Sequence, residues 1–429
     1  MTRLFGLTRA HWLLALALLV IVGVETGLRL GAASPDTRFT LPQYSLGYFW
    51  DTPLGWTGLV DGVLVNRDAV QFSSLAGFLH GQPVPVPPED NVYVRFAGYS
   101  LIGTSFAPLV GVYASFVLIN IAFWVAAALA TYMLAVRRTS DQRIAVLAAL
   151  LVSTAPAFAA LAGQPLPYVA SYGLFALALL LFDQLGVFER GTPLRSAAAA
   201  GFAAGLGLLV YDLYMLPAFV VVYGLLRRTS WRTLAVMLVA IALPRLAWSG
   251  YWQLMHLPSY SHNETHPIEA LYAWFDDART GTGVVAKLKG YLSLAGHGAL
   301  NIGAAFLFWP VLLAIWELWQ RRRSPEAVWF VAVAVAGFGP ALFMLSTWPH
   351  IPRWYGYGFP AVYILAAAAA VRIAASVSVP SASMVRRATL AGAVLLPAVV
   401  LANLDAVGYT KVMELLLFQP ERWSYLWSP

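Results

Sequence analysis

The sequence predicts an all-α polytopic membrane protein, and three observations carry that prediction. Of the 429 residues, 60% are hydrophobic and 11% are charged, whereas soluble proteins average about 25% charged residues. Apolar stretches of roughly 20 residues recur along the chain, and this is the length that a helix needs to cross about 30 Å of hydrocarbon. Arginines gather in every second connection between these stretches. The net charge of +7 is therefore a matter of membrane topology, and nucleic acid is not an expected partner.

These stretches predict about eleven transmembrane helices. They cover residues 11–32, 111–136, 143–162, 168–186, 196–210, 212–226, 233–250, 298–319, 326–347, 354–375 and 388–404. The fifth and sixth are short, and Gly201, Gly205 and Gly207 in the fifth would let helix backbones approach closely. The first carries Glu25 and Arg29 at its far end and lacks a small-residue cleavage site. We therefore expect an uncleaved anchor there and not a signal peptide.

The arginines predict the orientation of the chain. With the N-terminus inside, the inner connections contain Arg137, Arg138, Arg143, Arg190, Arg195, Arg227, Arg228, Arg232, Arg321, Arg322, Arg323, Arg386 and Arg387. This is the distribution that the positive-inside rule expects, and it leaves the C-terminal tail, residues 405–429, outside. Because the tail is rich in aromatic residues, we expect it to lie in the membrane interface, with docking on a partner protein as the alternative.

Two long outer loops, residues 33–110 and 251–297, are the expected working parts of the protein. Structureless loops longer than about 15 residues are uncommon unless they are functional or disordered. Apolar residues between Asp68 and Leu79 fall at helical spacing, which predicts a short helix along the membrane surface. At its start the Asp68 carboxylate would cap free N–H groups, and capping alone is the simplest interpretation of this residue. The second loop predicts two more surface helices, at 268–275 and 284–294.

The stretch "DAVQFSSLAGFLHG" resembles the surface-helix motif that follows the first span in the type C glycosyltransferases (GT-C). Those polytopic enzymes take a sugar from a polyprenyl-phosphate carrier and place it on an acceptor outside the membrane. The matching positions are Asp68, Phe72, Ala76, Leu79 and Gly81. Ala69 replaces the second acid of the family motif, so a mechanism that needs both acids is in doubt.

Further similarities to the family follow in the same order over most of residues 10–375. The segment "GLLVYDLYMLPAFVVVYGLLRR" resembles the paired short helices that carry a polar residue at their outer turn, here Asp212. The segment "WPHIPRWYGYGFPAVYILAAA" resembles the late outer loop in which an Arg-aromatic pair opens a span, here Arg353 and Tyr355. The resemblance rests on this order more than on identity.

The resemblance implies Asp68 as the base that takes the proton of the acceptor hydroxyl. Displacing an activated phosphate needs such a base, cations at the departing phosphate, and a cavity that aligns donor and acceptor. The outer-face groups that could meet the phosphate are Arg67, Arg95, Lys287, Lys289, His350, Arg353 and Tyr355. Arg353 is favoured, because a charge in a short loop between two spans is costly without a partner or a role. Snorkelling to lipid headgroups explains Lys287 and Lys289 equally well.

Three further acids compete with Asp68. Asp51 lies in an aromatic cluster that fits an interfacial belt, Asp61 is in the same outer loop, and Asp212 could face the same cavity as Asp68. No metal ligands are assigned, and dependence on a divalent ion such as Mg or Mn stays open because some GT-C families require one and others do not. The chain has no cysteine, which excludes disulfides and thiolate metal sites.

The function expected from the sequence is an inverting glycosyltransferase of a bacterial cell envelope. It would lie in the inner membrane with its active face periplasmic, and its partners would be a polyprenyl-phosphate sugar donor, membrane lipids and a lipid, glycan or protein acceptor. Bacterial origin rests on the arginine-rich, lysine-poor, alanine-rich composition. The alternatives are a non-catalytic subunit with the GT-C fold, which the Ala69 replacement favours, and an O-antigen-type polymerase or ligase. A transporter is disfavoured, because no internal repeat is evident and the spans are nearly free of charge at their centres.

Overall fold

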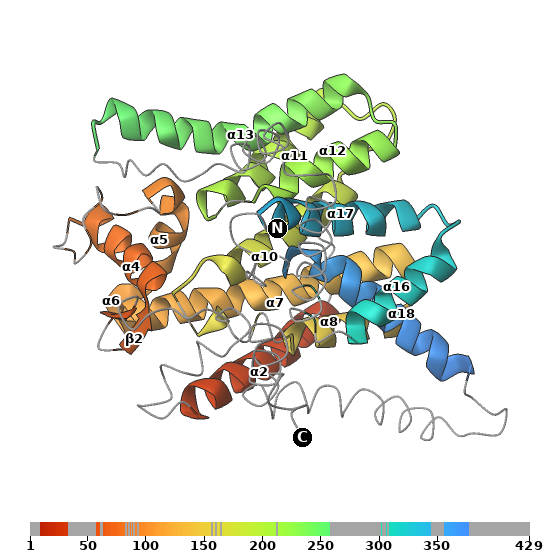
Figure 1. Ribbon diagram of the computed structural model, residues 1–429, viewed down its shortest axis with the longest axis horizontal. Coiled ribbons are helices and arrows are strands. Elements are labelled where there is room, and N and C mark those ends of the chain that lie inside the picture. Colours follow the sequence, from red (N-terminus) through yellow and green to blue (C-terminus); the bar gives the residue numbers. More distant parts are fainter. Residues whose placement is uncertain are drawn as a thin grey trace, which may run out of the picture.

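A computed structural model describes the structure of residues 9–32, 57–60, 63–81, 84, 86, 88, 91, 94–155, 158, 161–163, 165–211, 213–257, 302, 306, 309–344 and 356–376. Within these residues the chain is built almost entirely of helices (Figure 1). In chain order the elements are α2 (Arg9–Ala32), β1 (Thr57–Val60), β2 (Val63–Asn66), α4 (Arg67–Leu79), the 3-10 helix η3 (Val94–Phe96), α5 (Ala97–Gly103), α6 (Ala107–Val110), α7 (Val112–Thr139), α8 (Gln142–Ser153), α10 (Tyr168–Gln184), α11 (Leu194–Gly205), the 3-10 helix η4 (Leu206–Leu209), α12 (Met215–Leu226), α13 (Trp231–Leu254), α16 (Trp309–Arg321), α17 (Ala327–Met344) and α18 (Phe359–Ser376).

The chain is a multi-pass membrane protein by the length and composition of its helices. Among the described residues, three helical segments are long and apolar enough to cross a membrane: Val112–Thr139, Trp231–Leu254 and Gly356–Ala375. Shorter apolar helices occupy other predicted spans. Each of the predicted spans from 11–32 to 354–375 contains a helix. The predicted span 388–404, the tail 405–429 and the surface helices predicted at 268–275 and 284–294 lie outside the described residues.

The span predicted at 143–162 is wrong as one continuous helix. Helix α8 ends at Ser153, and Pro156, which follows in the sequence, disfavours helical geometry in the residue before it. Side chains of α7 bond backbone carbonyls in the last turn of α8 and beyond it. Trp124 Nε1 donates to the oxygen of Val152 at 2.7 Å, and Tyr113 Oη donates to that of Gly163 at 2.8 Å. Backbone groups at membrane depth need such partners because lipid offers none.

A β-hairpin precedes α4, where the sequence predicted only helices in the first outer loop. Strands β1 and β2 pair antiparallel, from Thr57 opposite Asn66 to Val60 opposite Val63. The two residues between the strands are Asp-Gly, the pair that favours a two-residue hairpin connection, and β-branched residues flank it. Strand β2 leads directly into α4, so the hairpin sets where that helix begins.

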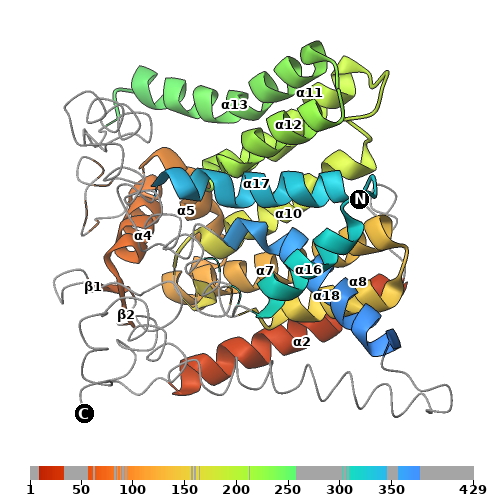
Figure 2. The same cartoon turned by 45° about the vertical axis from the view of Figure 1, so that its right-hand side comes forward.

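The helix bundle has two distinct ends. Helices α4 and α5 and the hairpin lie at one of them, which we call the loop end (Figures 1 and 2). Helix α7 runs from there to the opposite end, where Arg137 and Arg138 in its last turn both form ion pairs with Asp183 of α10. The guanidinium of Arg138 also lies 4.9 Å from the ring centre of Trp329 in α17. We call this the arginine end. Arg137 and Arg138 belong to a connection that the sequence predicted to lie on the inner side of the membrane.

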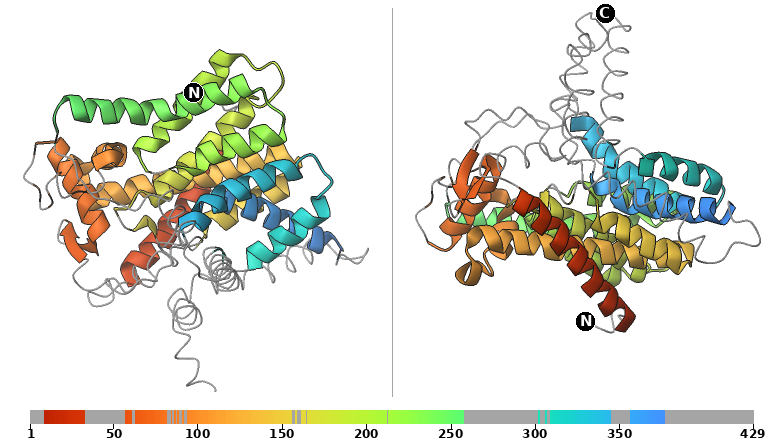
Figure 3. Two further views of the ribbon diagram at one scale, coloured as in Figure 1. Left: turned by 45° about the horizontal axis from the view of Figure 1, so that its top comes forward. Right: turned by 90° about the horizontal axis from the view of Figure 1, so that it is seen from below.

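Helix α2 lies across the outside of α7 and α8 at an oblique angle (Figure 3). Its start lies toward the arginine end, because the ring of His11 packs edge-on against Tyr132, close to the end of α7. Its apolar side chains Trp12, Leu16 and Val20 are more than half exposed, as expected of a helix that faces lipid.

Two glycines bring α11 and α13 into close contact, as the sequence predicted. A Cβ atom at Gly205 would lie 2.3 Å from the carbonyl oxygen of Ile241, and one at Gly201 would lie 2.7 Å from that of Met237. Both obstacles are backbone atoms, so only glycine fits at this crossing. Gly207 differs, since a Cβ there would meet the Leu213 side chain and no backbone.

Candidate active site

Helix α4 confirms the helix that the spacing of apolar residues between Asp68 and Leu79 predicted. Ala69, Phe72 and Ala76 belong to the main hydrophobic core, whereas Leu75 packs with Trp252 of α13 in a second cluster. The helix therefore buries two adjacent stripes against the bundle.

Hydrogen bonds also hold α4 in place at the loop end. Ser100 Oγ of α5 donates to the carbonyl oxygen of Phe72 at 2.9 Å, and Asn91 Nδ2 donates to that of Gln71 at 2.6 Å. The ring of Phe72 packs edge-on against Tyr99, with ring centres 5.3 Å apart. These contacts make the second turn of α4, which directly follows the turn with Arg67 and Asp68, part of a fixed platform, and a positioned catalytic group requires such support.

Tyr99 joins this platform to α7. Its hydroxyl donates to Asn120 Oδ1 at 3.1 Å, and its ring stacks at a tilt on Phe116 with ring centres 4.9 Å apart. Burial raises the pKa of Tyr99 well above its ordinary value, and this effect exceeds the opposing effect of the bond to Asn120. The phenol is therefore a neutral donor at physiological pH.

The backbone of Arg67 and Asp68 forms the start of α4, and the side chains of both residues lie outside the described part of the structure. The neighbouring Ala69, at the position of the missing second acid, is 0% exposed and packs in the main core. Successive helix residues point about 100° apart. A carboxylate at position 69 would thus be buried among apolar groups, at a cost of several kcal/mol unless it found a partner.

A chain of aromatic contacts links the first outer loop to the turn before α12. The ring of Phe96 in η3 packs on Tyr211 with ring centres 5.1 Å apart. Tyr211 in turn donates a hydrogen bond to the hydroxyl of Tyr168, at the start of α10, over 3.2 Å. Arg95 directly precedes Phe96, and Asp212 directly follows Tyr211. The structure therefore brings together the two segments that carry these predicted residues.

The segment that opens α18 reaches the same part of α10. The hydroxyl groups of Ser171 and Tyr357 are hydrogen-bonded at 2.6 Å, and the rings of Tyr172 and Tyr357 pack edge-on with centres 4.8 Å apart. Arg353 and Tyr355 stand just before this segment in the sequence. The stretches that lead to Asp212 and from Arg353 thus both contact the start of α10, and the stretch of Arg95 reaches it through Tyr211.

Arg245 is a residue of this region that the sequence analysis missed. It lies in α13 directly after Pro244, and its guanidinium lies 4.9 Å from the ring centre of Phe96. The guanidinium is therefore held at the junction of η3 with the aromatic chain. The signal was present in the sequence, since a charged residue inside a predicted span marks a functional position.

The remaining predicted site residues lie outside the described residues or have only their backbone described. The residues outside are Asp51, Asp61, Asp212, Lys287, Lys289, His350, Arg353 and Tyr355. For Arg95, only the backbone is described, as part of η3. Within the described part of the chain, no three His, Asp or Glu side chains gather as a metal site would require.

Comparison with known proteins shows the fold. No protein-family model matches the chain, and no curated protein matches it. ArnT from Cupriavidus metallidurans, solved with bound undecaprenyl phosphate, superposes with a TM-score of 0.52 and 17% sequence identity, over 89% of this chain and 74% of ArnT. Apo ArnT gives a TM-score of 0.50 at 17% identity, over 91% and 69%. The oligosaccharyltransferase AglB from Archaeoglobus fulgidus, solved with an inhibitory peptide and a dolichol-phosphate, gives 0.48 at 16% identity, over 93% and 55%.

ArnT is a polyprenyl-phosphate-dependent enzyme of the GT-C family. The chain therefore has the GT-C fold, as its resemblance to that family predicted.

Proposed function

We propose that this protein is an inverting glycosyltransferase that moves a sugar from a polyprenyl-phosphate donor to an acceptor hydroxyl. One observation supports the proposal: in a chain with the fold of ArnT, the residues next to Arg95 and Asp212 and the segment that follows Arg353 are connected to one another through the start of α10. The reaction would take place at the loop end, on the periplasmic face of a bacterial inner membrane. This face is the one that the arginine distribution assigns to α4.

Asp68 is the proposed general base. Its carboxylate takes the proton of the acceptor hydroxyl, whose oxygen attacks the anomeric carbon of the sugar. The bond from that carbon to the phosphate oxygen breaks, and the phosphate leaves with the bonding electron pair. A single displacement of this kind inverts the anomeric centre. It needs one carboxylate, so a mechanism without a second acid at position 69 is complete.

Cations at the loop end would stabilise the departing phosphate. Arg245 is presented from α13 against Phe96, and Arg95 is adjacent to Phe96 in sequence. Arg353 follows the favoured pattern of an arginine that opens a span, and Lys287 and Lys289 are further outer-face candidates. Guanidinium groups suit this task because they bind phosphate oxygens in pairs and strengthen their contacts as charge develops.

A non-catalytic subunit with the same fold is the second candidate, and the buried Ala69 favours it. The experiment that separates the two is sugar transfer from a panel of radiolabelled polyprenyl-phosphate sugars, using the purified full-length protein in lipid vesicles. We expect transfer from at least one donor, with inverted stereochemistry in the product. Donor binding without transfer to any lipid, glycan or peptide acceptor would support the non-catalytic subunit, and a product of retained configuration would contradict the mechanism.

A further inference from the structure

The second half of α13 carries a stripe of three residues that contact the first outer loop. Arg245, Trp248 and Trp252 are spaced i, i+3 and i+7, so they share one face of the helix. The guanidinium of Arg245 lies 4.9 Å from the ring centre of Phe96 in η3. Trp252 is 6% exposed and packs in one cluster with Leu75 of α4. The stripe therefore joins α13 to two segments of the candidate active site.

Trp248 is the member of this stripe that holds the backbone of η3. Its Nε1 donates a hydrogen bond to the carbonyl oxygen of Val94 over 3.3 Å. The indole is itself held by its neighbours on α13, since its ring centre lies 5.7 Å from that of Tyr251 and 5.5 Å from that of Trp252. An indole nitrogen has a single proton and accepts no hydrogen bond, so this bond uses its whole capacity. Packing and hydrogen bonding therefore both fix Trp248 against η3.

The helix η3 depends on such contacts, because it is only three residues long. A 3-10 turn of this length has too few internal hydrogen bonds to fix its own position. Helix α13 holds its first residue, Val94, through the backbone carbonyl and its last residue, Phe96, through the ring. The backbone of Arg95 lies between these two residues and is therefore fixed from both sides.

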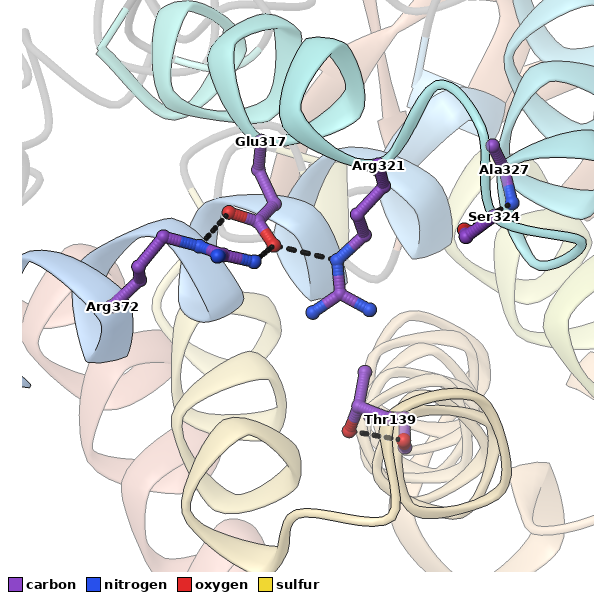
Figure 4. Close-up of polar contacts among 7 residues, drawn as sticks. Thr139, Glu317, Arg321, Ser324, Ala327 and Arg372 are labelled. Atoms are coloured by element: carbon purple, nitrogen blue, oxygen red, sulfur yellow. Dashed lines mark hydrogen bonds and ion pairs between the residues drawn. The ribbon is translucent and has the colours of Figure 1, made fainter.

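The ion pairs that join described residues hold other helices and lie at or near the arginine end. One set joins α7 to α10. In the other, Glu317 of α16 is 0% exposed and pairs with Arg321 of the same helix at 2.5 Å and with Arg372 of α18 at 2.8 Å (Figure 4). At η3 the described contacts with other helices are instead a hydrogen bond to an indole, ring packing and a cation–π contact. Removing the hydrogen bond should therefore loosen η3 and leave the helix bundle folded.

We propose that Trp248 is a positioning residue that holds Arg95 for phosphate binding during sugar transfer. This inference rests on the proposed function, in which Arg95 and Arg245 stabilise the departing phosphate. With η3 fixed on α13, two separate elements each direct a guanidinium to the phosphate, and its oxygens are bound without a further cost of ordering the segment. Trp248 itself makes and breaks no bond in the reaction, since it acts through the carbonyl of Val94.

Hydrogen exchange tests the anchor without reference to any reaction. Trp248→Phe keeps an aromatic ring and removes the N–H donor. We expect the backbone amides of η3 to exchange several-fold faster in this variant than in the wild-type full-length protein, because the segment opens more often. The matched control is Trp231→Phe, which changes a 74% exposed tryptophan at the other end of α13 and should leave exchange at η3 unchanged. Unchanged exchange in Trp248→Phe would overturn the proposal.

A double-variant cycle tests whether the anchor acts through Arg95. Sugar transfer is measured in lipid vesicles for wild type, Trp248→Phe, Arg95→Gln and the variant with both changes. Trp248→Phe should lower kcat/KM for the donor by about three- to tenfold, the range expected for one hydrogen bond. The double variant should equal Arg95→Gln, because the anchor has no effect once the guanidinium is gone. Losses that multiply independently would show a merely structural role and overturn the proposal.

A second variant covers the case in which Trp248→Phe does not fold. Benzothienyl-alanine at position 248 keeps the two-ring shape and has sulfur in place of the N–H. It should give the faster exchange and the lower kcat/KM expected of Trp248→Phe, and wild-type values for both would contradict the anchor. A wild-type protein that transfers no sugar would contradict the proposed function and the role of Arg95 with it, whereas hydrogen exchange would still show whether Trp248 holds η3.

Discussion

Arg245 is a charged side chain within a helix long and apolar enough to cross a membrane, and it is held against the aromatic ring of η3. If it meets the departing phosphate, Arg245→Gln should lower kcat/KM for the sugar donor by about tenfold or more, because a charge-assisted hydrogen bond is worth roughly 1.5–3 kcal/mol. Arg232→Gln is the control, since it removes a charge from the other end of the same helix. Steady-state kinetics on both variants check this, and equal kinetics in wild type and Arg245→Gln would remove Arg245 from the site.

Tyr99 ties α5 to Asn120 of α7 through a neutral phenol. Tyr99→Phe should lower the free energy of unfolding by about 1 kcal/mol at neutral pH through loss of that hydrogen bond. Because the folded-state pKa of Tyr99 is raised, the folded protein retains a proton that the unfolded chain loses above about pH 10. Its contribution is thus fully present below pH 10 and declines as pH rises further.

Thermal unfolding of the wild-type protein and of Tyr99→Phe in detergent, measured from neutral pH to above about pH 10, tests whether stability falls as the pH rises. The wild-type protein should lose stability more steeply above about pH 10 than Tyr99→Phe. Parallel curves would show that the phenol of Tyr99 does not titrate with unfolding.

At the scale of elements, the crossing of α11 and α13 depends on two glycines. Gly205→Ala places a methyl group against the Ile241 carbonyl and should cost roughly 1–3 kcal/mol of stability through overpacking. Gly250→Ala in α13 is the control, since no atom lies within 4 Å of its added Cβ. That variant should be neutral or stabilised by up to about 1 kcal/mol, because alanine favours a helix. Unfolding temperatures in detergent measure both, and equal values would contradict the close packing.

Most elements could be predicted from the sequence because apolar runs and apolar spacing are local properties. The spacing of residues 68–79 predicted a helix, and the structure has one at Arg67–Leu79. Gly201 and Gly205 predicted a close helix contact, and they make one with α13. The end of α8 at Ser153 was missed because the sequence stays apolar past Pro156, whereas the helix has already ended before this proline. The hairpin was missed because strands of four residues give little pattern.

The convergence of the candidate site could be predicted only in part. The separate segments were found by resemblance, but their meeting depends on contacts between distant residues. Ser171 and Tyr357, for example, are 186 residues apart and share a hydrogen bond. The charge of Arg245 inside a predicted span was a signal in the sequence, but its contact with Phe96 could not be predicted, because the spacing within α13 does not reveal where Phe96 lies.

For the whole molecule, the concentration of arginines at the arginine end, opposite α4, is the feature that predicts orientation. The chain has no cysteine, so single cysteines can report which side of the membrane each end occupies. We expect Ser105→Cys, exposed at the loop end, to react with a membrane-impermeant maleimide in intact spheroplasts. Arg190→Cys, exposed at the arginine end, should react only after the membrane is permeabilised. The reverse pattern would place α4 in the cytoplasm.

We propose that Asp68, at the start of α4, acts as the base of sugar transfer. The most direct measurement is the single-turnover transfer rate of Asp68→Asn beside wild type, with donor affinity measured on the same preparations. Loss of a general base should lower the rate by at least about 100-fold while donor affinity stays within a few-fold of wild type. An undiminished rate in Asp68→Asn would contradict the account and move the base to Asp51, Asp61 or Asp212.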